Sequence, residues 1–164
     1  SGEQGRMDLV VVFFGGVLGT AIRAGIELAW PTQIWPAATF TINLSGSFAL
    51  GILVGALFVR GPDNALRRRI RLGVGTGLLG GYTTYSTFII EGDELAHVGI
   101  GLAILYLVGS VVLGVLVAVL GMVMSRRFFA GERPAVEVAA VEGATVEAPA
   151  VEVRSAAPPR RGTD

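Results

Sequence analysis

A run of hydroxyl side chains beside two glycines is the stretch of this sequence best suited to hold a small ligand. Its members are Gly80, Gly81, Tyr82, Thr83, Thr84, Tyr85, Ser86, Thr87 and Phe88. Glycine and short hydroxyl residues are poor helix formers, yet this run lies inside a long apolar segment. In hydrocarbon, a helix break survives only where protein buries it or where it lines a polar path. One hydroxyl alone would be explained by a bond to the preceding turn, but the whole cluster indicates a functional site.

The chemistry of the run favours a small anion. With Asn43 it offers neutral hydrogen-bond donors and acceptors, and no carboxylate stands at the same depth to bind a cation. The rings of Tyr85 and Phe88 present edges that are partly positive. Donors and ring edges suit a strongly hydrated anion that exchanges water for protein contacts, although these residues do not select which anion. A bond that holds two helices together is an equally good explanation of Asn43 taken alone.

Composition places these residues in a membrane protein. The chain is 52% hydrophobic and only 16% charged, against roughly a quarter charged in soluble domains. The absence of cysteine excludes disulfides, and the single histidine, His97, excludes a histidine-rich metal site. The formal net charge of zero gives no reason to expect a nucleic-acid partner. Neither a nucleotide-binding loop nor a nucleophile–base arrangement is recognisable, so we expect no enzyme.

Four apolar segments are long enough to cross a bilayer of about 30 Å. They cover about residues 9–30, 37–59, 72–90 and 98–124. Glycines four apart, at 15 and 19 and again at 51 and 55, favour close approach of another helix. The predicted fold is an all-α membrane protein with four transmembrane helices, the third broken in mid-membrane. Residues 1–8 form an N-terminal segment, 9–127 the transmembrane domain, and 128–164 a disordered tail in which Val-Glu pairs recur every five residues.

Arginines predict the orientation. With four spans, both termini and the loop between the second and third spans share one side, and nearly all arginines fall there: Arg6, Arg60, Arg67, Arg68, Arg69, Arg71, Arg126, Arg127 and Arg133. The opposite side has Arg23 near it and an acidic cluster at residues 91–94. The positive-inside rule therefore puts both termini in the cytoplasm. Arg23 and Glu27 are four apart and can pair, either at the membrane surface or in a site.

Three ordered motifs resemble the Fluc (CrcB) fluoride channel family. They are Gly16-x-x-Gly19-Thr20-x-x-Arg23, Thr39-Phe40-Thr41-x-Asn43-x-x-Gly46-Ser47-Phe48-x-x-Gly51 and Gly80-Gly81-x-Thr83-Thr84-Tyr85-Ser86-Thr87-Phe88-x-x-Glu91. The resemblance covers about residues 9–127 and omits the tail. It implies an antiparallel dimer in the bacterial plasma membrane, with two pores through which fluoride leaves the cytoplasm passively.

The resemblance also implies roles for individual residues. The carbonyls of Gly80 and Thr83 would hold a structural Na⁺ at the dimer centre. Asn43 would donate to fluoride, while the rings at 85 and 88 would form an aromatic box. Arg23 would lie at the aqueous vestibule. The remaining pore and polar-route residues would be Thr39, Ser86, Thr87, Glu91, Tyr106 and Ser110.

Two features depart from the family pattern. Tyr85 stands where the family usually has Phe, and its hydroxyl either donates to the anion or obstructs the box. The strong arginine bias favours one orientation, so we expect a heterodimer with an oppositely oriented paralogue. Two other functions stay open: a small multidrug-type proton antiporter, for which Glu27 is the carboxylate available, and a non-conducting partner subunit.

Overall fold

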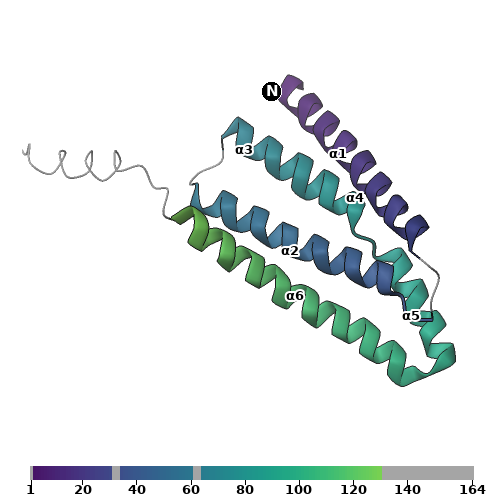
Figure 1. Ribbon diagram of the computed structural model, residues 1–164. Coiled ribbons are helices and arrows are strands. Elements are labelled where there is room, and N and C mark those ends of the chain that lie inside the picture. The colour runs from purple at the N-terminus through teal and green to yellow at the C-terminus, as the bar shows by residue number, and fades with distance from the viewer. Residues whose placement is uncertain (1, 31–33, 61–63, 131–164) are drawn as a thin grey trace, which may run out of the picture. The chain divides into compact units, whose positions relative to one another are not determined.

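The computed structural model describes residues 2–30, 34–60 and 64–130, and over these residues it is helical and contains no strand (Figure 1). Three described helices are long and apolar enough to cross a membrane: α1 (Gly2–Ala29), α2 (Ala37–Val59) and α6 (Ile100–Ala130). α2 has the bounds of the second expected segment, while α1 begins earlier than expected and α6 ends later. Residues 131–164, which hold nearly all of the predicted tail, lie outside the described residues.

The third expected segment is built from several elements. α3 (Ala65–Ile70), the wider π-helical turns of η1 (Arg71–Leu79) and α4 (Gly80–Tyr82) follow one another directly. Thr83 then adopts an extended backbone (φ −76°, ψ 156°), and helix resumes as α5 (Ser86–Val98). Gly80 and Gly81 are still helical, so the helical path is interrupted just after the glycines, in the hydroxyl run itself.

The first close packing joins α1 to η1 and α4 (Figure 1). A Cβ on Gly15 would meet the carbonyl of Gly73, and one on Gly19 would meet Leu78 O and Tyr82 N. Contacts that advance together along both helices show that the two run parallel. The predicted close approach at Gly15 and Gly19 is thus confirmed, and backbone rather than side chain lies opposite them.

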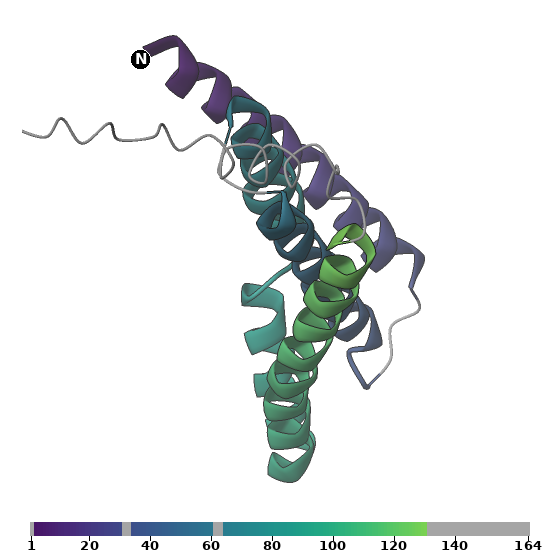
Figure 2. The same ribbon diagram turned by 90° about the vertical axis from the view of Figure 1, so that its left-hand side faces the viewer.

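The second close packing joins α2 to α6, again in parallel. Gly51 faces the backbone of Ala118, and Gly55 faces that of Met122 at the next turn. The prediction for this glycine pair is also confirmed. Figure 2 shows α6 and α2 crossing as neighbours in the second view as well.

A small aromatic core lies where α5 packs against α6. Phe88 and Leu95 from α5 are buried with Ala103 and Tyr106 from α6. Elsewhere, large apolar side chains cover the outward faces of α1 and α6; Phe13 is 64% exposed and Leu105 is 63% exposed. Such surfaces are expected of helices that face lipid or another subunit, since hydrocarbon does not penalise them.

Candidate functional site

The interruption between α4 and α5 is held from α2 by one side chain. Asn43 Nδ2 donates to Thr84 O at 2.9 Å, and Asn43 Oδ1 accepts from Thr84 N–H at 2.9 Å. The carboxamide thereby replaces the two backbone partners that Thr84 would have in a continuous helix. Because unpaired backbone groups are costly away from water, this paired contact stabilises the non-helical geometry.

Helix α1 holds Gly81, the second-to-last residue of α4 before the interruption. The carbonyl of Gly81 accepts from Thr20 Oγ1 and from Arg23 Nε, each at 3.3 Å. Arg23 Nη1 also lies 3.4 Å from Glu27 Oε1, which confirms the predicted pairing of these two residues. The last carbonyls of a helix lack internal partners, so the α1 donors serve as a side-chain cap for α4.

A third set of bonds starts α5. Thr84 Oγ1 accepts from Thr87 N–H at 3.3 Å and lies 3.1 Å from Thr87 Oγ1, the geometry of a threonine that caps a helix N-terminus. The amides of Thr84 and Thr87 would bond Gly80 O and Thr83 O in a continuous helix. Here they donate to Asn43 and to the Thr84 hydroxyl instead. The carbonyls of Gly80 and Thr83 have therefore lost their usual helical donors.

Beside the interruption lies a cavity of about 380 Å³, here called the break cavity. Its lining includes six of the expected site residues: Asn43, Gly80, Thr83, Tyr85, Phe88 and Ser110. The two rings have centroids 6.4 Å apart but differ in burial, since Tyr85 is 76% exposed and Phe88 is 8% exposed. The tertiary structure thus brings the second, third and fourth expected segments together around one cavity.

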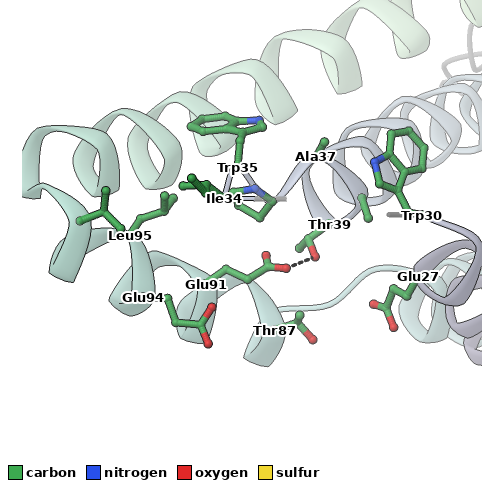
Figure 3. Close-up of a pocket in the computed structure, with 13 residues that line it drawn as sticks. Glu27, Trp30, Ile34, Trp35, Ala37, Thr39, Thr87, Glu91, Glu94 and Leu95 are labelled. Carbon is green, nitrogen blue, oxygen red and sulfur yellow. Dashed lines mark hydrogen bonds between the residues drawn. The ribbon is translucent and has the colours of Figure 1, made fainter. Parts of the chain in front are cut away.

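A second cavity, of about 480 Å³, contains the acidic residues and is here called the glutamate cavity (Figure 3). Thr39, Thr87 and Glu91 line it, as do Glu27 and Glu94. Glu91 Oε1 accepts from Thr39 Oγ1 at 2.8 Å, the bond dashed in Figure 3, and its Oε2 accepts from Tyr106 Oη at 2.8 Å. Each carboxylate oxygen therefore has a hydroxyl donor from a different helix.

Tyr106 connects the two cavities. Its side chain is fully buried, with its ring 5.1 Å from that of Phe88 and 5.4 Å, edge to face, from that of Trp35. Phe88 lines the break cavity, whereas the Tyr106 hydroxyl reaches Glu91 in the glutamate cavity. Ser110 Oγ donates to Tyr106 O one turn along α6. The Phe88 ring in the break cavity and the Glu91 carboxylate in the glutamate cavity are therefore linked through the single side chain of Tyr106.

The expected residues that lie apart are Ser86 and Arg23. Ser86 is exposed at the first turn of α5 and lines neither cavity. Arg23 also lines neither cavity; its guanidinium group donates to the carbonyl of Gly81 and pairs with the carboxylate of Glu27. Sequence analysis assigned no contact to Thr20 or to Trp35. Thr20 lies three residues before Arg23 and so on the same helical face, and this spacing could have predicted that both contact the same group. No feature of the sequence could have predicted the contact between Trp35 and Tyr106.

Comparison with known proteins gives consistent matches. The family model described as "CrcB-like protein, Camphor Resistance (CrcB)" matches residues 10–122. A Leifsonia xyli protein named "Fluoride-specific ion channel FluC 2" is 45% identical over 109 residues, covering 65% of this chain and 75% of its own. "Fluoride-specific ion channel FluC 1" of Cutibacterium acnes is 46% identical over 123 residues, covering 72% and 86%. A Bacillus subtilis protein named "Fluoride-specific ion channel FluC 2" is 40% identical over 116 residues, covering 71% and 86%.

Proposed function

The chain belongs to the CrcB-like protein family, and on that premise we propose that it is a fluoride-selective passive ion channel of the bacterial plasma membrane. Members of this family are ion channels and not enzymes, and the relatives named above are called fluoride-specific. The observation that carries the proposal is the clamp of Asn43 on Thr84. It supports a stable helix interruption, which we place in mid-membrane, beside a cavity lined by donors and ring edges.

Fluoride meets two kinds of group in the break cavity. The Asn43 amide has a second N–H beyond the one donated to Thr84, and we assign that hydrogen to the anion. Ring edges of Phe88 and Tyr85 supply further positive potential, and the Tyr85 hydroxyl adds a donor in its exposed position. Donors fixed in advance replace the hydration shell without reorganisation, which makes passive permeation of a strongly hydrated ion feasible.

The route continues through the hydroxyls around Glu91. Thr39, Thr87, Tyr106 and Ser110 lie between or along the two cavities and exchange hydrogen bonds with the ion as it passes. Thr39 and Tyr106 each donate to Glu91, so both hydroxyls turn toward the ion only if they leave that carboxylate. Arg23 attracts anions near the aqueous end of the route while it holds Gly81. The Ser86 side chain that faces the route is the one supplied by a second subunit.

The carbonyls of Gly80 and Thr83 fit a structural Na⁺. Hard cations take oxygen ligands, and these two oxygens have lost the amides that would bond them in a continuous helix. A Cβ on Gly80 would meet nothing within 4 Å, so its side of the helix is open to another chain. Two oxygens are too few for a cation, and a second copy or paralogue supplies the rest at a dimer centre.

We place the pores at the interface of an antiparallel dimer. A single copy packs as two helix pairs whose break cavity is open on one side, and a partner would close it. The arginine-rich helix ends face the cytoplasm, so both termini are cytoplasmic. Since that bias favours a single orientation, the antiparallel partner is an oppositely oriented paralogue.

Fluoride efflux from liposomes tests the function, first with the purified chain alone and then with the chain co-expressed with an oppositely oriented paralogue. An electrode should record fluoride release that outpaces chloride release, either from this chain alone or after co-expression with an oppositely oriented paralogue. Release in the first case would establish a homodimer and refute the heterodimer. No release in either case would refute the channel and favour the non-conducting subunit.

A further inference from the structure

A third cavity lies at the opposite end of the helices from the glutamate cavity. It occupies about 290 Å³ where the first turns of α1 meet the start of α3, and it is here called the arginine cavity. Its lining consists of Gln4, Asp8, Asn64, Ala65, Arg68, Arg69 and Arg71. None of these residues belongs to the proposed fluoride route.

The charges of the arginine cavity are unbalanced. Arg68 Nη2 lies 2.8 Å from Asp8 Oδ2, which neutralises the one carboxylate among the described residues of the lining. Arg69 and Arg71 bring further guanidinium groups to the same cavity. Asn64 caps α3 by accepting from Arg67 N–H at 2.8 Å, which fixes the turn that presents these arginines. The described lining therefore brings three guanidinium groups and one carboxylate together at the start of α3.

Exposed apolar side chains lie close in sequence to the residues that line the arginine cavity. Leu9, next to Asp8, is 72% exposed. Leu66, about one turn before Arg69, is 64% exposed, and Ile70, directly after it, is 37% exposed. A site for a free inorganic anion needs no exposed apolar side chains beside it. A ligand with both an anionic group and hydrocarbon matches the two surfaces together.

We propose that the arginine cavity binds the headgroup phosphate of an acidic phospholipid. Guanidinium groups bind phosphate through paired, charge-assisted hydrogen bonds, and basic pockets between transmembrane helices recognise anionic headgroups. The acyl chains lie against Leu9, Leu66 and Ile70, while the phosphate accepts from Arg69 in the cavity. The lipid joins the start of α1 to the start of α3, in addition to the ion pair between Asp8 and Arg68.

Native mass spectrometry of the purified full chain in detergent tests this site. The protein is titrated with dioleoyl phosphatidylglycerol or with dioleoyl phosphatidylcholine, and the lipid-bound fraction is measured. Arg69→Gln should lower the phosphatidylglycerol-bound fraction about fivefold, as expected for loss of charge-assisted bonds. Arg127→Gln is the matched control, because Arg127 is exposed at the end of α6 and removes the same charge outside the cavity.

A second pair of variants tests for an increase in the phosphatidylglycerol-bound fraction. Asp8→Asn should raise the phosphatidylglycerol-bound fraction, since Arg68 is then available to the phosphate, while the control Glu3→Gln should not change it. Equal losses in Arg69→Gln and Arg127→Gln would overturn the proposal in favour of diffuse attraction. So would equal binding of phosphatidylcholine, or displacement of the lipid by inorganic phosphate at the same concentration.

Discussion

Asn43 holds Thr84 by both ends of its carboxamide, with each hydrogen bond 2.9 Å long. The two residues are far apart in sequence, on α2 and in the interruption between α4 and α5. One side chain thus supplies the donor and the acceptor that the helix gives up at that point. The interruption is a defined structure rather than a frayed helix end, because its backbone groups have fixed partners.

The Asn43→Ala variant should lose both stability and fluoride conduction. It leaves the N–H and C=O of Thr84 without their partner, at a cost of about 1–3 kcal/mol for each group. We expect a lower midpoint of thermal unfolding in detergent and fluoride efflux reduced by about 100-fold or more. Ser47→Ala is the control, since Ser47 lines the same cavity. Unchanged efflux in Asn43→Ala would contradict the role of the clamp.

Tyr106→Phe should slow fluoride without unfolding the protein. The ring keeps its contacts with Phe88 and Trp35, but Glu91 Oε2 loses its donor. Loss of one such bond is worth about 1 kcal/mol, so we expect efflux to fall about five- to tenfold. Tyr82→Phe is the matched control, because the Tyr82 hydroxyl bonds Ser45 at an exposed position. Equal efflux in the two variants would remove Tyr106 from the route.

Gly19→Ala should prevent α1 from packing. The added methyl group would meet Leu78 O and Tyr82 N, which are backbone atoms and cannot move aside as a flexible side chain can. Overpacking of this kind costs about 1–3 kcal/mol or more. We expect a reduced yield of folded protein in size-exclusion chromatography. Gly25→Ala, on the same helix with nothing within 4 Å, should behave as wild type.

Glu27→Gln separates the channel from a proton antiporter. The ion pair of Glu27 with Arg23 is 3.4 Å long and partly exposed, and such pairs contribute about 0–1 kcal/mol. Fluoride efflux should therefore stay within about twofold of wild type, with no requirement for a pH gradient. Transport that is abolished by this change, or that stops when the proton gradient is collapsed, would favour the antiporter.

Much of the membrane architecture follows from local sequence. The apolar length of residues 37–59, between Pro36 and Arg60, defines a helix with those bounds, since a spanning segment must satisfy its backbone internally. The glycine pairs at 15 and 19 and at 51 and 55 predicted close helix contacts for the same local reason: a missing side chain allows close approach on one face. The glycines and hydroxyls at residues 80–88 likewise indicated a stretch of low helix propensity, within which residues 83–85 are not helical.

Only the tertiary structure decided which residues meet. Nothing in the sequence pairs Asn43 with Thr84 rather than with an ion, or Thr20 and Arg23 with the carbonyl of Gly81, because those bonds depend on how α1 and α2 pack against α4. The position of the break, after Gly81 and not at it, has the same origin. Glycine permits a break, but the side chains of neighbouring helices determine which backbone groups give up their helical partners.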